Sequence, residues 1–506
     1  MAQPTLGAEV ADRPTTVVRS AIRGARRSGR SDILLWLMPG LVTLAVGLLG
    51  SGRPQMWGDE LASWTAANRT VPQLFGMLHH VDAVYGVYYV FLHFWMQVFG
   101  DSAVTLRVPS AIAMAVAAAF IALTGRRLFS RRAGLLAGLI FAVVPSVSRY
   151  AQEVRPYAIV MAAVAIATWC LLRALERPTL LRWVCYGVSI AAVGLFQLVA
   201  LSLLLPHACM VILQSWPSRP WRRWAQFAVT VLVAVLPAAP LALLGQAQVG
   251  KQISWIDRPT PESLPALWEA MYGPALFSLL VLAAAAMTLG WAKNRRPVLQ
   301  VFLTAVLPVA LVYFVSQGSI SYFIARYLLF TLSAWVVLAG AGLAAIRPRV
   351  LAIVGVIVLA VASYGTQVSI RSLTDRVNFD ERGAARVVAQ GYQQGDGLVV
   401  PHDSTIFDSG VKFYLPKNVK PRDIFESVSP AAGNSLVTEN CAQPVSCLGA
   451  EPRIWVVSVG PDQPIDQRSP YANIDQAQGA ALASKYHAVH TTHLYNTWVT
   501  LLERNS

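Results

Sequence analysis

The chain has 506 residues, of which 55% are hydrophobic and only 13% are charged, and its formal net charge is +15. Soluble proteins carry charges on about a quarter of their residues, so this composition excludes a soluble globular protein and predicts a polytopic membrane protein. The basic excess does not indicate nucleic-acid binding, because the basic residues lie in short tracts between apolar runs, as in cytoplasmic loops.

The first 32 residues are polar and rich in arginine, and we expect a disordered cytoplasmic tail there rather than a cleavable signal peptide. Apolar runs of roughly 16 to 22 residues follow, and each is long enough to cross a bilayer as a helix. We predict eleven spans, at 33–50, 104–124, 133–148, 157–174, 181–197, 198–215, 225–245, 274–292, 298–316, 326–346 and 349–369.

One further run, Val84 to Gly100, decides the topology. It is short and rich in aromatic residues. If it does not cross, the N-terminal tail and five basic clusters all fall on the cytoplasmic side, as the positive-inside rule requires. We therefore expect it to lie at the interface as a juxtamembrane helix. Residues 51–103 then form one external loop, and the transmembrane domain covers 33–369.

Residues 370–506 differ in composition, and we predict a small extracytoplasmic α/β domain. The segment 379–404 is typical of an amphipathic helix, a Gly-Asp-Gly turn and a strand that stops at a proline. Further strands are expected at 453–460 and 496–504.

Two of the five cysteines, Cys441 and Cys447, share one polar segment of this tail. In a reducing compartment such a pair indicates a metal site or nothing, and in an oxidising one it indicates a small-loop disulfide. Because the tail is predicted to be external, we expect a disulfide.

Two adjacent carboxylates, Asp59 and Glu60, follow the first span in the sequence PQMWGDELASW. Acidic residues near a hydrocarbon boundary are costly unless they are solvated or used. A solvated helix start is one explanation, since acids favour first turns. Catalysis is the other. Adjacent residues cannot share one helix face, so we expect only one of the two to point at a reaction centre.

Several arginines lie next to the external end of a span, against the positive-inside rule. Snorkelling to headgroups explains any one of them. The alternative is a lipid phosphate, whose oxygens pair bidentately with guanidinium groups. With the acid pair, this predicts a carboxylate that deprotonates an acceptor hydroxyl and arginines that stabilise a departing lipid phosphate. The residues are Arg107, Arg149, Arg155 and Arg326.

Other side chains of the external loop form weaker patterns. A group of histidines and one aspartate lacks the spacing of a known metal site, so we expect solvated or interfacial histidines. An aromatic stripe at helical spacing is typical of interface anchoring, with sugar stacking as the alternative. These two groups are His79, His80, Asp82 and His93, and Tyr85, Tyr88, Tyr89 and Trp95.

Several segments, taken in order, resemble the glycosyltransferase C superfamily. They are MWGDE, LHHVDAVYGVYYVFLHFWMQVFGDSAVTLRVPSAIA, GRRLFSRRAGLLAGLIFAVVPSVSRYAQEVRPYA and the later ARYLLF. The branch they resemble is that of the protein O-mannosyltransferases and the lipid A aminoarabinose transferases. The resemblance covers about 45–175 and, more loosely, 320–400. It implies an enzyme of the bacterial plasma membrane that takes a polyprenyl-phosphate sugar as donor on the outer face.

The resemblance also implies roles for single residues. By motif position Asp59 is the catalytic base and Glu60 orders the loop around it. Some members carry a second Asp after the third span, where this chain offers Glu153 instead. We expect a single displacement with inversion, in which Arg155 and Arg326 hold the lipid phosphate. No cofactor is required, because arginines supply the positive charge; a divalent metal is the alternative, which no sequence feature supports.

Mannose is the expected sugar, with arabinose or aminoarabinose as the alternative, and the acceptor is a cell-envelope glycan, a lipoglycan or a protein. A lipid-linked-sugar transporter is a rival reading that needs polar groups along the spans, where Gln197 and His207 are the exceptions in otherwise apolar runs. A non-catalytic scaffold is a third reading, and it predicts that Asp59→Asn is silent.

Overall fold

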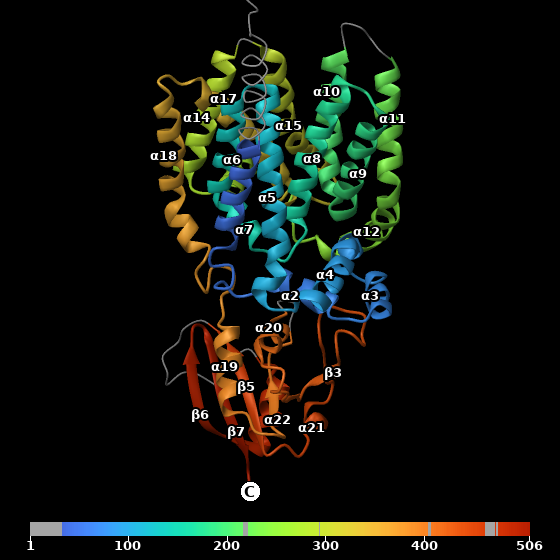
Figure 1. Ribbon diagram of the computed structural model, residues 1–506. Coiled ribbons are helices and arrows are strands. Elements are labelled where there is room, and N and C mark those ends of the chain that lie inside the picture. Colours follow the sequence, from blue (N-terminus) through green and yellow to red (C-terminus); the bar gives the residue numbers. More distant parts are fainter. Residues whose placement is uncertain (1–32, 216–220, 293, 403–405, 461–470, 472–473) are drawn as a thin grey trace, which may run out of the picture.

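The computed structural model describes residues 33–215, 221–292, 294–402, 406–460, 471 and 474–506. A helical bundle forms most of the chain, and a smaller α/β domain lies at one end of it (Figure 1). The expectation for residues 1–32 falls outside the described residues.

All eleven apolar runs are helical. Six helices of the described residues are long and apolar enough to cross a membrane, or eight if each bent pair is one span. Three further runs form shorter apolar helices, so the count of eleven stays a prediction. The bundle consists of Ile33–Leu48, α5 (Ala103–Leu128), α6 (Arg131–Val143), α7 (Pro145–Ala151), α8 (Tyr157–Glu176), α9 (Leu180–Phe196), α10 (Leu204–Ser215), α11 (Trp221–Val235), α12 (Ala239–Gln252), α13 (Ser263–Tyr272), α14 (Ala275–Trp291), α15 (Arg295–Val315), α16 (Ala325–Leu328), α17 (Leu332–Ala345) and α18 (Arg349–Ser369).

Proline and glycine set the two sharp bends. Pro145 has no N–H and its ring clashes with the preceding turn, so α6 ends at Val143 and α7 leaves at 65°. Gly273 adopts a φ of 94° between α13 and α14, which meet at 92°. Glycine also permits close packing, because a Cβ on Gly342 of α17 would lie 1.9 Å from the carbonyl oxygen of Ala284 on α14.

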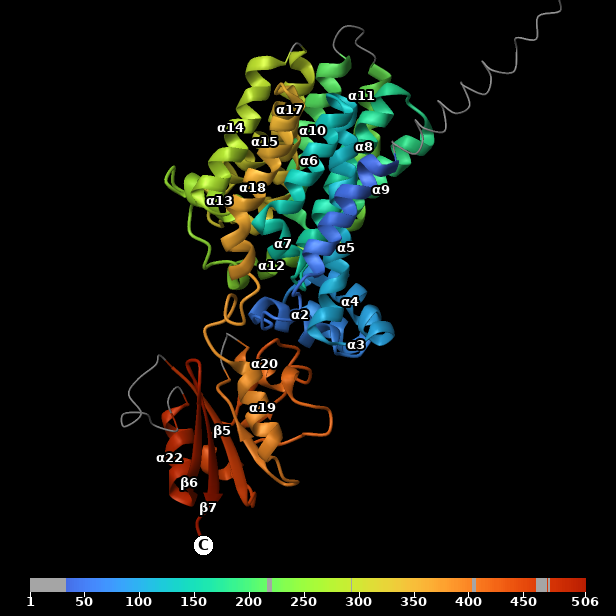
Figure 2. The same ribbon diagram turned by 60° about the vertical axis from the view of Figure 1, so that its left-hand side comes forward.

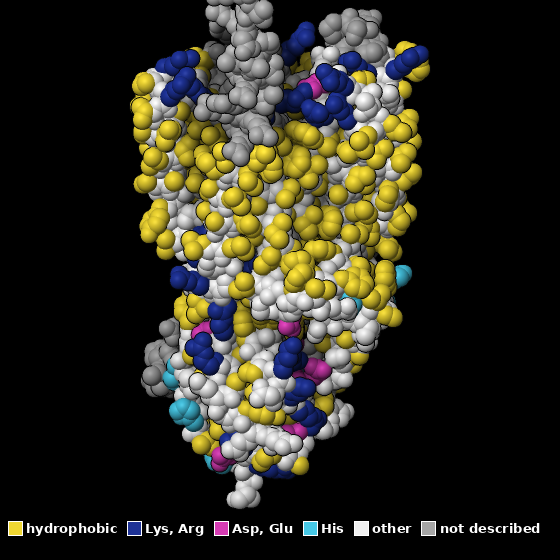
Figure 3. All heavy atoms as spheres, viewed as in Figure 1, with side chains coloured by type: hydrophobic (Ala, Val, Ile, Leu, Met, Phe, Trp, Pro, Cys, Tyr) yellow, Lys and Arg dark blue, Asp and Glu magenta, His cyan; other side chains and the backbone are white. Residues whose placement is uncertain are grey.

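Basic side chains gather at the end of the bundle far from the α/β domain, and a hydrophobic belt surrounds its middle (Figure 3). Arg126 and Arg127 lie in the last turn of α5, and Arg295 begins α15. This is the distribution that the positive-inside rule predicts if that end faces the cytoplasm.

The segment predicted as an external loop forms a layer of short helices between the bundle and the α/β domain (Figure 2). The run expected at the interface is a short 3₁₀ turn followed by α4, and it lies in this layer beside α2 and α3. The elements are α2 (Gly58–Ala67), α3 (Val71–Leu78), η1 (Ala83–Tyr85) and α4 (Gly86–Phe99).

The α/β domain has three layers, and the middle layer is a five-stranded sheet of order β2-β1-β5-β7-β6. Side chains alternate across β5: Trp455 and Val457 pack with α19 and α20, whereas Ile454 and Val456 pack with α22. Cys441 and Cys447 form a disulfide. The elements are α19 (Glu381–Gly391), β1 (Gly397–Val399), α20 (Phe407–Tyr414), β2 (Arg422–Asp423), β3 (Glu426–Val428), β4 (Glu439–Asn440), α21 (Pro444–Cys447), β5 (Arg453–Val459), α22 (Gln476–Lys485), β6 (Tyr486–Leu494) and β7 (Thr497–Arg504).

Candidate active site

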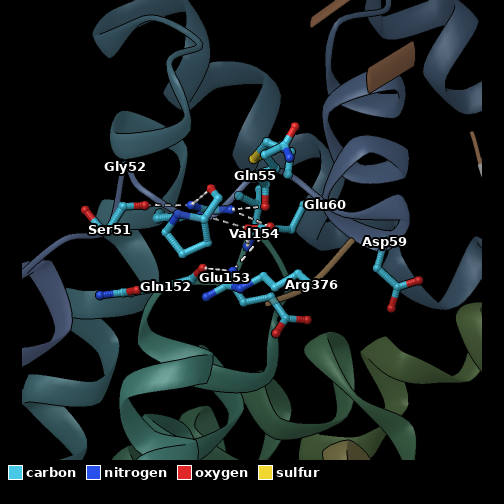
Figure 4. Close-up of polar contacts among 12 residues, drawn as sticks. Ser51, Gly52, Gln55, Asp59, Glu60, Gln152, Glu153, Val154 and Arg376 are labelled. Carbon is cyan, nitrogen blue, oxygen red and sulfur yellow. Dashed lines mark hydrogen bonds and ion pairs between the residues drawn. The ribbon is translucent and has the colours of Figure 1, made fainter. Parts of the chain in front are cut away.

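The acidic pair lies in the first turn of α2, directly after Trp57. Consecutive helical residues are rotated by about 100°, so the two carboxylates point to different sides. Figure 4 shows Glu60 inside a network of polar contacts and Asp59 turned away from it. The side chain of Glu60 is fully buried, and that of Asp59 is 27% exposed.

Both oxygens of Glu60 are occupied. Arg107 of α5 donates to them from Nε at 2.8 Å and from Nη2 at 2.6 Å. The backbone N–H of Val154 donates at 3.0 Å, and Arg376 lies at 3.3 Å. Burial by itself would raise the pKa of Glu60, but the charges of Arg107 and Arg376 outweigh it and lower that pKa to about 2. Glu60 is therefore an ionised anchor.

Arg107 organises the loop that precedes α2. Its guanidinium is fully buried and also donates to the carbonyl oxygens of Ser51 at 2.6 Å, Pro54 at 3.0 Å and Gln55 at 3.2 Å. With its donors used in this way, Arg107 has none to offer a lipid phosphate. Its position against the positive-inside rule has a structural cause.

Asp59 faces two arginines that come from distant parts of the chain. Arg155, in the segment before α8, lies 3.2 Å from Oδ1, and Arg326 of α16 lies 3.6 Å from Oδ2. Tyr89 of α4 holds Arg155 in place, because it accepts a bond from Nη1 at 3.0 Å and donates to Asp82 at 2.6 Å. The structure therefore brings two predicted site residues to Asp59 and a third, Tyr89, to Arg155.

Aromatic rings hold the same two guanidinium groups. Arg155 lies 4.6 Å from the ring centre of Tyr85, and Arg326 lies 5.2 Å from that of Trp255 and 5.9 Å from that of Tyr327. In the described part of the chain, Nε of each arginine is buried without a hydrogen-bond partner. Fixed guanidinium groups with donors to spare are suited to an oxyanion.

A cavity of about 440 Å³ begins at these rings, since Tyr85 and Tyr327 both line it. It extends between η1, the chain after α9, α12 and the end of α15. Its wall is mainly apolar and includes Val84, Phe196, Leu198, Val199, Leu201, Val249, Ile253, Leu311, Val312 and Val315. The charged site around Asp59 is therefore adjacent to an apolar cavity.

Arg149 is separate from this pair. It forms an ion pair with Glu153, and its guanidinium lies 5.6 Å from the ring of Trp57. Burial raises the pKa of Glu153 against the charge of Arg149, and within the described residues its Oε1 has no hydrogen-bond partner. The structure therefore does not bring Arg149 to Asp59 as a third phosphate ligand.

His80 lies outside the site. It is exposed, and its Nδ1 is 3.0 Å from the carbonyl oxygen of Gly76 on α3. His93 contacts the carbonyl oxygen of Ala67 at 2.9 Å. No group of three potential metal-binding side chains comes together among the residues that the structure describes.

Sequence reasoning missed Arg376. It lies in the polar linker between α18 and α19, where one arginine is ordinary, yet its side chain is fully buried against Glu60. Only the long-range fold reveals this contact, since 316 residues separate the two.

A bundle of apolar helices with a charged site at one end defines a multi-pass membrane protein. Residues 87–243 match the family described as dolichyl-phosphate-mannose-protein mannosyltransferase. No curated protein matches the chain.

Solved structures share the fold at low identity. ArnT from Cupriavidus metallidurans bound to undecaprenyl phosphate is 14% identical over 92% of this chain and 97% of its own, with a TM-score of 0.61. Its apo state has the same identity and coverage and a TM-score of 0.57. The Archaeoglobus fulgidus oligosaccharyltransferase is 12% identical over 79% of this chain and 61% of its own, with a TM-score of 0.47. The family match over residues 87–243 and the fold shared with ArnT agree with the resemblance seen in the sequence.

Proposed function

We propose that the protein is a membrane glycosyltransferase that moves a sugar from a polyprenyl-phosphate donor to an acceptor hydroxyl on the outer face of a bacterial plasma membrane. One observation carries the proposal: Asp59 faces Arg155 and Arg326 at the mouth of an apolar cavity. The likeness to ArnT bound to undecaprenyl phosphate supports a donor of this kind.

In this proposal the polyprenyl chain occupies the cavity, and its phosphate binds Arg155 and Arg326. Their contacts to Asp59, at 3.2 and 3.6 Å, are long for charge-assisted bonds. An incoming phosphate therefore competes well for the arginines and releases the carboxylate. Asp59, at 27% exposure, is then open to an acceptor.

The reaction is a single displacement. The acceptor hydroxyl gives its proton to Asp59 while its oxygen bonds to the anomeric carbon from the face opposite the phosphate. The bond between that carbon and the phosphate oxygen breaks with its electron pair on the oxygen. Arg155 and Arg326 stabilise the charge that grows there, polyprenyl phosphate leaves, and the anomeric configuration is inverted.

We propose mannose as the sugar, because the matching family is described as a mannosyltransferase. Arabinose or aminoarabinose is the alternative. The acceptor that we propose is a cell-envelope glycan, a lipoglycan or a protein.

The transporter alternative gains no support from the polar residues within the bundle. His207 is fully buried, with its ring nitrogens 3.2 Å from the hydroxyl of Thr168 and 3.1 Å from that of Tyr186. Gln197 lines the apolar cavity itself. Neither provides a polar path for a sugar head group.

The test uses purified protein in lipid with three labelled donors, which carry mannose, arabinose or aminoarabinose on polyprenyl phosphate. Transfer to a crude envelope fraction is measured for the parent, for Asp59→Asn, and for Asp101→Asn as a control. Asp101 belongs to the same external loop and has no ion pair within the described residues. We expect one donor to be consumed by the parent and by Asp101→Asn but not by Asp59→Asn. Failure of the parent with all three donors would contradict the proposal.

A further inference from the structure

The linker between α18 and α19 lies against the loop that leads to Asp59. Two arginines, one at the start of the linker and one in α19, donate to backbone carbonyl oxygens of that loop or of the end of the helix before it. Gln55 adds a further tie, because its side chain donates to the carbonyl of Phe379 at 3.1 Å and accepts from the N–H of Arg382 at 2.8 Å. The arginine contacts are Arg371 to Val46 and Leu49, both at 2.8 Å, and Arg382 to Gly52 at 3.1 Å and Arg53 at 3.2 Å.

Arg376, between these two, makes a different set of contacts. Its side chain is fully buried, and Nη1 lies 3.3 Å from Oε2 of Glu60. It also donates to the carbonyl oxygen of Gln152 from Nη1 and to that of Arg149 from Nη2, the latter at 3.4 Å. One guanidinium thus joins the first turn of α2 to the segment that leads to Arg155 (Figure 4).

Those two segments carry the two halves of the proposed site. Glu60 is the residue after Asp59, and Gln152 lies three positions before Arg155. Movement of either segment changes the 3.2 Å contact between Asp59 and Arg155. A misplacement of about 1 Å in an active site can lower a rate roughly 100-fold.

We propose that Arg376 is a positioning residue of the active site, which sets Asp59 against Arg155 by holding Glu60 and the carbonyl of Gln152 together. This inference rests on the proposed function. It makes the start of the C-terminal region a part of the active site, although the reacting groups belong to the bundle and its loops.

The test compares Arg376→Gln, Arg376→Lys and Arg371→Gln in the full-length protein. Each variant is assayed for sugar transfer, for binding of undecaprenyl phosphate and for thermal stability. Arg371→Gln is the matched control, because it also removes a guanidinium from backbone carbonyl oxygens, those of Val46 and Leu49, but Arg371 does not contact Glu60.

We expect Arg376→Gln to lower kcat by roughly 10- to 100-fold. Arg376→Lys should recover part of this loss, since an ammonium keeps the charge but not the fork of donors. Arg371→Gln should lower thermal stability by a similar amount yet keep kcat within about twofold of the parent. In a Glu60→Gln background, where the shared partner is altered, the effect of Arg376→Gln should shrink.

The inference is overturned if Arg376→Gln keeps the kcat of the parent, or if Arg371→Gln loses as much. These outcomes leave the proposed function intact, because the parent still transfers sugar and binds the lipid. A parent that neither binds undecaprenyl phosphate nor consumes a donor overturns the proposed function, and this inference with it.

Discussion

The two acidic residues in the first turn of α2, Asp59 and Glu60, differ in burial and in how fully their contacts are made. On the Glu60 side, a buried carboxylate is held by Arg107, by the N–H of Val154 and by Arg376 at 2.6–3.3 Å. On the Asp59 side, a partly exposed carboxylate meets two arginines at 3.2 and 3.6 Å beside a cavity. The carboxylate whose hydrogen-bonding capacity is fully used has a structural role, whereas the arginines that keep free donors beside the other carboxylate are available to a ligand. The difference assigns structure to one acid and chemistry to its neighbour.

The largest effect on stability is expected from Glu60→Gln. It leaves Arg107 and Arg376 buried without a counter-charge, and breaking a buried pair in this way costs about 3–5 kcal/mol. Thermal unfolding in detergent should show a large fall in Tm for this variant and little change for Asp59→Asn. Equal Tm values for the two variants would contradict the assignment of a structural role to Glu60 and not to Asp59.

The same carboxylate gives stability a dependence on pH. The pKa of Glu60 is about 2 in the folded protein and 4.5 ordinarily, so the unfolded state binds the proton more readily. Its contribution to stability is therefore complete above pH 4.5 and is lost as the pH falls toward 2. Tm measured down this range should fall in the parent, and Glu60→Gln should lack this part of the decline. If Tm falls equally with pH in the parent and in Glu60→Gln, the low pKa assigned to Glu60 is wrong.

On the other side, Arg155→Gln and Arg326→Gln should weaken donor binding. A hydrogen bond to a charged group contributes about 1.5–3 kcal/mol, which corresponds to roughly a 10- to 150-fold rise in the Kd for undecaprenyl phosphate. Arg149→Gln provides the contrast, because Arg149 pairs with Glu153 and not with Asp59. Its Kd should stay within about threefold of the parent value. A loss equal to that of Arg155→Gln would return Arg149 to the phosphate site.

The smallest effect is expected from Tyr89→Phe. The ring remains, but its hydroxyl no longer bridges Arg155 and Asp82, which removes a contribution of about 1 kcal/mol to the placement of Arg155. The Kd for undecaprenyl phosphate should rise by roughly fivefold. Tyr88→Phe is the control, since Tyr88 is also buried on α4 and forms no hydrogen bond with Arg155 within the described residues. An equal rise in both variants would show that general packing of α4 is responsible.

Local patterns in the sequence carried much of this account. The length of the apolar runs located most of the bundle helices but not α13, and the 100° rotation between neighbours indicated that Asp59 and Glu60 would diverge. The strands at 453–460 and 496–504 were found as β5 and β7 because their residues are apolar and β-branched. The edge strand β6 was missed, since most of its side chains are polar and exposed.

The partners of the arginines were beyond such reasoning. Arg107 and Arg149 lie next to the external end of a span, as Arg155 does, yet Arg107 forms an ion pair with Glu60 and Arg149 forms one with Glu153. Arg376 carried no signal at all. Which charge meets which depends on long-range packing of loops onto the bundle, and spacing along the chain does not encode it.

The central claim is that Asp59 is the base and not a lipid ligand or a frame residue. The most direct measurement compares Asp59→Asn with the parent for both sugar transfer and binding of undecaprenyl phosphate. The amide keeps the shape of the side chain but cannot take the acceptor proton, so kcat should fall by about 10²–10⁴-fold while the lipid binds at least as tightly as before. Transfer at the rate of the parent, with the variant folded, would contradict the account.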